Sequence, residues 1–203
     1  MKKGKTYALL LGCFGILFGT VFYIKSLSNK SYKDDYNYID KPILNDLKPV
    51  IKDTKTITRP FLDENVKIKV NYYDYKSTED EQKSALIYFE NTYLQNSGVV
   101  YGMDNDFDVV SILDGVVTEV KEDKTLNTIV TIKHENNVIS VYQGLKDVTV
   151  KKDEEISAGT VIGKSSESSM LKNYKSTILF ELIVNGTNVN PENYYNKTID
   201  ELS

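Results

Sequence analysis

The sequence predicts a mainly β domain that follows a single membrane-spanning helix. The first observation behind this prediction is an uncharged apolar run from Tyr7 to Ile24. The second is a period of two: beyond residue 60, short stretches alternate apolar and polar residues between turn-like separators. Such alternation places successive side chains on opposite faces of a strand, whereas a helix repeats about every 3.6 residues. The 203 residues suffice for one domain of ordinary size plus an anchor and a linker.

The apolar run 7–24 has the length of a membrane helix. As a helix it would span roughly 27 Å, which is enough for the hydrocarbon core of a bilayer. Lysines at positions 2, 3 and 5 precede it, so residues 1–6 are expected to be a cytoplasmic tail and the chain after Lys25 to lie outside. A cleaved signal peptide and a lipoprotein signal at Cys13 are the alternatives. The run is long for a signal peptide and stays apolar after Cys13, so a retained single-pass anchor fits better.

A polar stretch, residues 25–58, is expected to be an extracytoplasmic stalk. Lys-Pro steps at Pro42 and Pro49 favour an extended chain over a regular helix. Isolated apolar residues such as Ile43 and Leu47 leave a second possibility open, in which a short helix from this stretch docks on the domain or on a partner.

Composition excludes some classes of function. The net charge is −4, from 25 basic and 29 acidic residues, and Arg59 is the only arginine. Nucleic acid is therefore not expected as a partner, because phosphate binding uses clustered Lys and Arg. The single cysteine excludes an intramolecular disulfide. The single histidine, His134, cannot supply the three protein ligands that a catalytic zinc site needs.

Short strands at regular spacing make up the rest of the chain. A capping-box pattern, Thr78 with Glu81, predicts one helical turn before the apolar run 85–89. Turn signals such as Asp114-Gly115 separate the strands, which indicates an all-β sandwich or a barrel-like domain. The expected strands are residues 66–70, 107–113, 116–122, 128–134, 138–144, 148–151, 160–163 and 177–185.

Seven short motifs, taken in order, resemble those of the LytM-type (lysostaphin-like) peptidase family. The resemblance covers roughly residues 96–195 and rests on order and spacing, since no motif is diagnostic alone. It implies a LytM/lysostaphin-like β-sheet sandwich, built on a duplicated hybrid motif, with residues 59–95 as the strands that lead into it and residues 196–203 as a C-terminal tail. The motifs are Phe107-Asp-Val-Val, Asp114-Gly-Val-Val, Val130-Thr-Ile-Lys-His134, Val141-Tyr-Gln-Gly-Leu145, Gly159-Thr-Val-Ile-Gly163, Phe180-Glu181 and Asn190-Pro191.

The resemblance also implies that the catalytic site has been lost. Active members of the family bind zinc through a His and an Asp four residues apart and through the second His of a His-x-His pair. They carry catalytic His residues in that pair and in a Tyr-x-His-Leu segment. Here Val, Gly and Leu offer no ligand atom, and Asn and Thr are poor substitutes for imidazole, so neither a metal nor a cofactor is expected. The matching positions are Asn96, Val100, Gly144, Thr177 and Leu179.

His134 does not restore such a site. It ends an expected strand, where the family often has a His that is not a zinc ligand. A metal ligand needs convergent partners, and none accompanies His134 in the sequence. A partly exposed strand-end side chain is therefore expected.

The layout of tail, helix, stalk and domain resembles the membrane-anchored sporulation members of this family. That resemblance implies a non-catalytic protein of the forespore membrane, whose domain faces the space between two membranes. It further implies a partner, the extracytoplasmic domain of stage III sporulation protein AH from the mother cell, with which the domain would form a channel or bracket. The alternative is a non-catalytic regulator of a separate cell-wall hydrolase, or a peptidoglycan-binding module. An active hydrolase would need zinc ligands that the sequence lacks.

The partner surface is expected at a strand edge or sheet face near residues 128–150. Alternating strands with exposed edges can accept a further strand from another protein, which is the physical basis of this expectation. The candidate residues are Thr128, Val130, Ile132, Val138, Ser140, Tyr142 and Val148.

Two further features are expected to have other roles. Asp104, Asp106 and Asp108 alternate like the start of a calcium loop, but the glycine and the closing glutamate of such a loop are absent, so an acidic turn is expected. The polar stretch 165–175 is long for a connection between strands. Loops of that kind are often mobile or bind partners, and in the resembled fold this one borders the groove.

Overall fold

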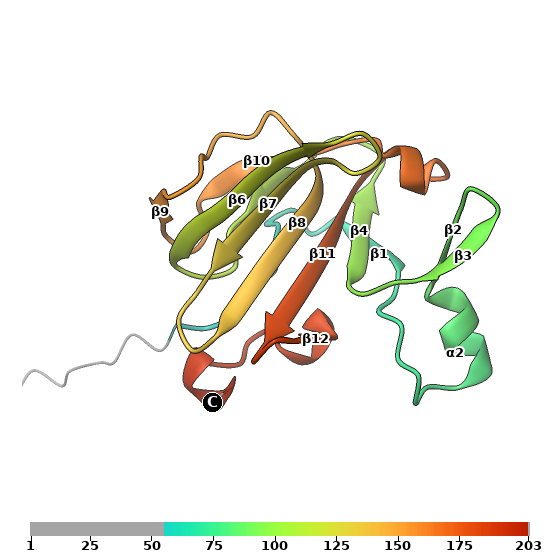
Figure 1. Cartoon of the computed structure of the whole chain (residues 1–203), viewed down its shortest axis with the longest axis horizontal. Helices are drawn as coiled ribbons and strands as arrows, with labels where there is room; N and C mark the ends of the chain where they lie inside the picture. Colours follow the sequence, from blue (N-terminus) through green and yellow to red (C-terminus); the bar gives the residue numbers. More distant parts are fainter. Residues whose placement is uncertain (1–54, 203) are drawn as a thin grey trace, which may run out of the picture. The chain divides into compact units, whose positions relative to one another are not determined.

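The computed structural model describes residues 55–202, all of which belong to one compact unit, Ile51–Ser203. Figure 1 shows an antiparallel sheet with a small hairpin module beside it. The predicted anchor at 7–24 and nearly all of the predicted stalk lie outside the described residues. Within residues 55–202, no helix is long and apolar enough to cross a membrane.

Ten strands form one sheet, in which every pairing is antiparallel. Its main path runs β1-β4-β11-β8-β7-β6-β9, while β10 pairs with β5 and with β8, and β12 pairs with β11. The strands of the path are β1 (Lys67–Val70), β4 (Val99–Met103), β11 (Ser176–Val184), β8 (Val138–Lys146), β7 (Asn127–Lys133), β6 (Gly115–Asp123) and β9 (Glu155–Ile156). The others are β5 (Asp108–Val110), β10 (Val161–Ser165) and β12 (Thr187–Val189).

A small module precedes β4 in the chain. Its helix α2 (Glu79–Ser84) begins at Thr78, whose hydroxyl accepts from the Glu81 N–H while the Glu81 carboxylate accepts from the Thr78 N–H, so the predicted capping box is confirmed. The strands β2 (Leu86–Phe89) and β3 (Thr92–Gln95) form a hairpin whose two turn residues have positive φ, as this type of tight turn requires. Short 3-10 helices follow later in the chain at η2 (Ser169–Leu171), η3 (Pro191–Asn193) and η4 (Ile199–Leu202).

The core lies against one face of the main sheet. Ile178, Phe180 and Leu182 of β11 are fully buried, and the Tyr142 ring of β8 packs 5.1 Å from the Phe180 ring. Side chains of β5, β10 and residues 57–61 complete this core from the other side. The opposite face of β6, β7 and β8 is left uncovered by the described part of the chain (Figure 1).

The prediction of a mainly β fold is confirmed, and β6, β7, β8 and β11 lie within two residues of their expected bounds. The prediction of a strand at residues 148–151 was wrong. The chain there is extended, but only the Thr149 N–H donates to a neighbouring carbonyl, and a turn at Asp153 with φ 67° leads into β9 instead. Apolar residues of this segment, such as the buried Val150, thus pack into the core without pairing with a strand of the sheet.

The ends of the domain also differ from the expected ones. Ile57, from the predicted stalk, and Ile199, from the predicted tail, are both buried in the core. The Ile57 N–H donates to the Lys197 carbonyl at 2.9 Å, and Thr56 forms a β-bridge with Thr198. Burial of the two isoleucines makes residues 55–58 and 196–202 part of the folded unit.

Candidate functional site

Three neighbouring strands carry the positions that the resemblance assigns to ligands and catalytic groups. Val100 of β4 pairs with Leu179 of β11, which pairs in turn with Gln143 of β8. Thr177 lies two residues before Leu179, on the same face of β11. A Cβ at Gly144 would lie 3.2 Å from the Thr177 carbonyl oxygen. The backbone therefore brings these positions close together.

Asn96, just before β4, binds backbone groups. Its side-chain amide donates to the Asn71 carbonyl at 2.9 Å and to the Val70 carbonyl at 3.4 Å. Its side-chain oxygen accepts from the Gly98 N–H at 3.4 Å. Asn96 is buried, so these bonds satisfy the amide and tie the end of β1 to the start of β4.

An apolar cluster occupies the place between these positions. Val100 is 0% exposed and Leu179 is 6% exposed. The Thr177 hydroxyl is buried and finds no hydrogen-bond partner among residues 55–202. The residues present do not fit a zinc ion, which needs several convergent nitrogen, oxygen or sulfur ligands. The apolar cluster consists of Val70, Ile87, Val100, Leu171 and Leu179, with Met170 and Tyr174 packed against it.

The polar loop 165–175 covers the apolar cluster. The Ser166 hydroxyl donates to the Gly144 carbonyl at 2.7 Å, and the Ser168 and Ser169 hydroxyls donate to the Thr125 carbonyl at 3.1 and 3.0 Å. Leu171, in η2, is buried in the cluster. The serines that make this loop polar in sequence thus attach it to the rest of the domain.

A groove of about 570 Å³ remains between the β2–β3 hairpin and this loop. Its lining includes both apolar and polar side chains, such as Tyr88, Phe89, Asn91 and Met170. Glu90 is the one carboxylate among the residues that line it, and the lining contains no imidazole. Acid–base catalysis normally needs one group that donates a proton and one that accepts a proton, both within reach of the substrate. Lys172 and two tyrosines also line the groove, which offers a mixed polar and apolar surface for binding.

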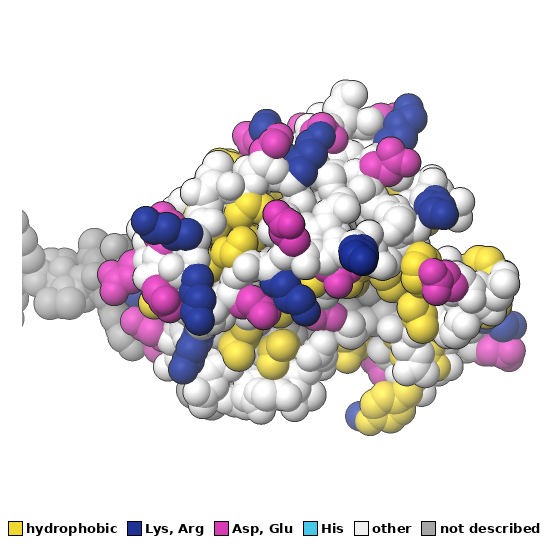
Figure 2. Space-filling view, turned by 45° about the horizontal axis from the view of Figure 1, so that its top comes forward, with side chains coloured by type: hydrophobic (Ala, Val, Ile, Leu, Met, Phe, Trp, Pro, Cys, Tyr) yellow, Lys and Arg dark blue, Asp and Glu magenta, His cyan; other side chains and the backbone are white. Residues whose placement is uncertain are grey.

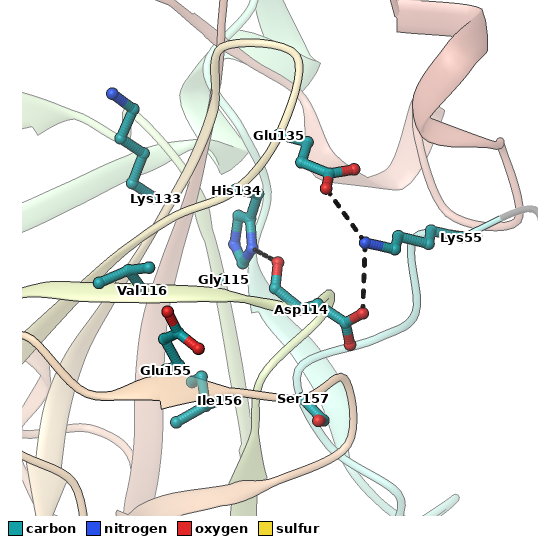
Figure 3. Close-up of a pocket in the computed structure, with 10 residues that line it drawn as sticks. All are labelled: Lys55, Asp114, Gly115, Val116, Lys133, His134, Glu135, Glu155, Ile156 and Ser157. Atoms are coloured by element: carbon teal, nitrogen blue, oxygen red, sulfur yellow. Dashed lines mark hydrogen bonds and ion pairs between the residues drawn. The ribbon is translucent and has the colours of Figure 1, made fainter.

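His134 lies just after β7, beside a second, open hollow of about 630 Å³ (Figure 3). The expected partial exposure was wrong, because the side chain is only 4% exposed. Its Nδ1 is 2.8 Å from the Asp114 carbonyl oxygen and its Nε2 is 2.7 Å from the Ser140 hydroxyl. Since a carbonyl only accepts, Nδ1 carries the proton and Nε2 accepts from Ser140. His134 therefore joins the start of β6 to β8.

Ion pairs surround this hollow. The Lys55 ammonium lies 3.4 Å from the Asp114 carboxylate and 3.3 Å from that of Glu135, as Figure 3 shows. A hydrogen bond from the Ala158 N–H holds the pKa of Asp114 below its usual value. Burial raises this pKa, and the neighbouring Lys55 ammonium lowers it further. The ion pairs attach the first described residue to two turns of the sheet.

Acidification below about pH 6.5 is expected to destabilise the domain through His134. Burial lowers the pKa of His134, and the Asp114 carbonyl and carboxylate offset only part of this effect. The unfolded chain therefore binds this proton more readily, and unfolding becomes more favourable as the pH falls through the unfolded-state pKa of about 6.5. The free energy of unfolding of residues 51–203, from urea titrations, should decline between about pH 7.5 and 5.5.

The same titrations on His134→Gln provide the control. That decline should vanish in the variant, whatever its overall stability, because the chain has no other histidine. Carboxylates whose pKa is lowered, such as Asp106 and Asp114, lose their stabilising effect only at more acidic pH, below about 4 to 5. Equal slopes in the two proteins would show that another group titrates.

The three alternating aspartates do not converge on one point. Each faces a different lysine, which agrees with the expected acidic turn, and within residues 55–202 no three His, Cys, Asp or Glu side chains are placed to hold a metal ion. The pairs are Asp104 with Lys175 at 3.9 Å, Asp108 with Lys164 at 2.9 Å, and Asp106 with Lys146.

Most residues predicted for the partner surface face the core. Thr128 and Val148 are half-buried, but the other five are completely buried. The predicted residues lie on the core-facing side of β7 and β8. Both faces carry β-branched aliphatic residues, so a period of two does not tell which is inside. The buried residues are Val130, Ile132, Val138, Ser140 and Tyr142, whereas the outward ones are Ile129, Thr131, Ile139 and Val141.

Comparison with known proteins shows which family of proteins this part of the chain resembles. Residues 94–191 match peptidase family M23. A zinc containing peptidase from Vibrio cholerae shares the fold, with a TM-score of 0.53 and 18% identity over 66% of this chain and 38% of that chain. This part of the chain is therefore similar to an M23 domain, with apolar side chains at Val100 and Leu179, two positions that the resemblance assigns to zinc ligands.

The relatives with higher identity are sporulation proteins. Stage II sporulation protein Q of Bacillus subtilis (strain 168) is 27% identical over 96% of this chain and 71% of that protein, and this chain is its homologue. A chain of the SpoIIQ–SpoIIIAH pore forming complex matches with a TM-score of 0.70 and 28% identity, over 73% of this chain and 96% of that one. A second SpoIIIAH and SpoIIQ complex matches with a TM-score of 0.65 and 29% identity, over 68% of this chain and 99% of that one. The matched parts make up nearly all of those solved chains, so relatives of about this extent fold without a longer chain.

Proposed function

We propose that this chain is a membrane-anchored sporulation protein whose M23 domain binds, without cutting, the extracytoplasmic domain of a stage III sporulation protein AH. The observation that carries this proposal is the similarity to SpoIIQ chains from two solved complexes with SpoIIIAH, at 28% and 29% identity. Homology to stage II sporulation protein Q over 96% of the chain supports the same assignment.

The absence of catalysis rests on the chemistry of the site. The apolar cluster includes Val100 and Leu179, two positions that the resemblance assigns to zinc ligands, and Asn96 is bound by backbone carbonyls. A buried hydrocarbon cluster cannot polarise a peptide carbonyl or activate water. The domain would act through the surfaces that it presents to a partner.

The place of action follows from the anchor. The apolar run 7–24, with lysines on its N-terminal side, would hold the protein in the forespore membrane with its first residues in the cytoplasm. The domain, at the end of the stalk, would then face the space between the two membranes. There it would meet a partner from the mother cell and form with it a channel or bracket.

The outward face of β7, β8 and β11 is the best candidate for the partner surface. Thr131, Val141 and Glu181 lie opposite one another across the three strands, and Lys133, Ile139 and Ile183 form the next row. Figure 2 shows hydrophobic side chains among Lys, Asp and Glu side chains on this side of the molecule. A partly apolar face with charged neighbours is typical of interfaces between separately folded proteins.

The test is calorimetric titration of residues 51–203 with the extracytoplasmic domain of the partner. The unmodified domain should bind, and Ile139→Glu should weaken the affinity at least about tenfold, because it places a charge in a contact that excludes water. Ile139 pairs with Lys133, so the new carboxylate has a favourable neighbour and the fold should persist. Val161→Glu is the matched control, since Val161 is 41% exposed on β10, away from this face.

The outcomes separate the two parts of the proposal. If the unmodified domain does not bind the partner at all, the proposed function is wrong. If it binds and Ile139→Glu binds equally well, or if Val161→Glu weakens binding as much, the assigned face is wrong and the function stands.

A further inference from the structure

Most of one sheet edge lacks a partner strand. β9 pairs only with Gly115 and Val116 of β6. The next residue, Val117, exchanges backbone hydrogen bonds with Asp153 and Glu154. From Thr118 to Asp123 no part of residues 55–202 pairs with β6 on that side, past which the segment between β8 and β9 runs in Figure 1. An edge of this length presents unpaired N–H and C=O groups that can accept another strand.

The edge strand at the other end of the main sheet path, β1, is protected against pairing with another copy, whereas β6 is not. The edge strand β1 is short and carries Lys67 and Lys69, which lie two residues apart and therefore on one face. Like charges on a short edge discourage pairing between identical copies. On β6 the corresponding positions are Glu119 and Lys121, which bear opposite charges. Both side chains are exposed, and neither has an ion-pair partner within the described part of the chain.

The charges on β6 favour one register for pairing with a second copy. If two β6 strands run antiparallel about a two-fold axis at Val120, Glu119 of each copy lies opposite Lys121 of the other. A shift of one residue would turn the partner's side chains to the wrong face, so registers change in steps of two. Centring the pair on Lys121 sets that lysine opposite its own copy, and centring it on Glu119 does the same for the glutamate. Centring it on Glu122 pairs Lys121 with Asp123 but sets Glu122 opposite its own copy. Only the Val120 register both matches opposite charges and avoids every like-charge pair.

We propose that a second copy of this chain docks on the open edge of β6, in the antiparallel register centred on Val120. The two sheets then become one continuous sheet across a two-fold interface, in which the same residues of each copy contact each other. This contact leaves the outward face of β8 and β11 free, so it is independent of the proposed partner binding.

Sedimentation of residues 51–203 over a range of concentrations tests this contact. The unmodified domain should form a dimer with a dissociation constant below about 1 mM. Glu119→Lys and Lys121→Glu, taken singly, each set like charges opposite one another twice in the dimer, so each should raise the dissociation constant at least about tenfold.

Mixing the variants gives the decisive result. In a heterodimer of Glu119→Lys with Lys121→Glu, every charge again faces its opposite, so an equimolar mixture should dimerise although neither variant does so alone. The double variant with both changes should likewise form a dimer, with an affinity within about threefold of the unmodified domain. Lys133→Glu and Glu155→Lys are the controls, because they make the same changes of net charge at exposed positions on β7 and β9.

Three results would overturn the proposal. These are an unmodified domain that stays monomeric at all concentrations, single reversals that dimerise like the controls, and a mixture of the two variants that stays monomeric. None of them involves the stage III partner, so they leave the proposed function untouched.

Discussion

Replacing Val100 with Asp is expected to lower the free energy of unfolding by about 3–5 kcal/mol, because it buries a carboxylate without a partner. Val100 is fully buried in the apolar cluster. Asp is somewhat smaller than Val, so the loss is mainly electrostatic, with a smaller contribution from lost packing. Urea unfolding of residues 51–203 at pH 7 measures it. In the matched control Val161→Asp, at the exposed β10 position, the same change should cost less than about 1 kcal/mol.

The pH dependence of Val100→Asp identifies the cause of the loss. Desolvation raises the pKa of a buried carboxyl, so the folded variant binds a proton more readily than the unfolded chain does. Its deficit relative to the unmodified domain should therefore shrink as the pH falls towards 5, whereas a purely steric deficit would stay constant. Equal losses for Val100→Asp and Val161→Asp would show that water reaches residue 100 and that the cluster is not sealed.

Zinc provides a second arm of the same experiment. The unmodified domain should show no change in its unfolding midpoint with zinc, because its cluster offers no ligands. The triple variant Asn96→His, Val100→Asp, Leu179→His should be stabilised by zinc, since β4 and β11 still hold residues 100 and 179 opposite each other. Stabilisation of the unmodified domain by stoichiometric zinc would contradict the non-catalytic proposal.

Replacing Glu192 with Ala is expected to cost about 2–4 kcal/mol, because it leaves two partners without their acceptor. The Arg59 guanidinium donates to both carboxylate oxygens of Glu192, at 2.8 and 2.7 Å. The buried Tyr101 hydroxyl donates to the same carboxylate at 2.6 Å and lies 2.8 Å from the Tyr195 hydroxyl. Burial opposes ionisation of Glu192, but Arg59 and Tyr101 outweigh it and hold the pKa of Glu192 below its usual value.

A double-mutant cycle between Arg59→Ala and Glu192→Ala measures the coupling directly. We expect about 1.5–3 kcal/mol, since the pair is bidentate and partly shielded from water. The Glu79–Lys83 pair is the control: its atoms are as close, at 2.8 Å, but it is exposed on α2 and should couple by no more than about 0.5 kcal/mol. A coupling as small as that of the control would show that the network does not fasten the two ends of the domain.

The proposal that the zinc site is lost rests on the sequence, because ligand chemistry belongs to individual side chains. Valine and leucine cannot bind zinc wherever the fold places them, so Val100 and Leu179 could be judged from their identity alone. The apolar cluster could not be predicted. Ile87 and Leu171 join it from a hairpin and a loop that are distant in sequence, and nothing local marks them as neighbours of residue 100.

Burial was less predictable than strand position, for a related reason. The alternation in β7 and β8 set the strands almost to the residue, yet Ile132 and Ile139 look alike in sequence although one is buried and the other faces outward. His134 was expected at a strand end and is found there, but its burial depends on Asp114 and Ser140, which arrive from other strands. A one-dimensional pattern records the period of two and not the side on which the core lies.

The sequence by itself determined a mainly β domain that resembles a peptidase family and has no ligand side chain at the positions matched to its zinc site, since periodicity and side-chain chemistry are local properties. Tertiary structure alone decided what replaced the ligands, which face of the sheet is free, and where the domain ends. Arg59 shows the reason: the only arginine of the chain begins the segment predicted as strands leading into the domain, and its partner Glu192 is 133 residues away. Contacts over such separations exist only once the sheet has formed.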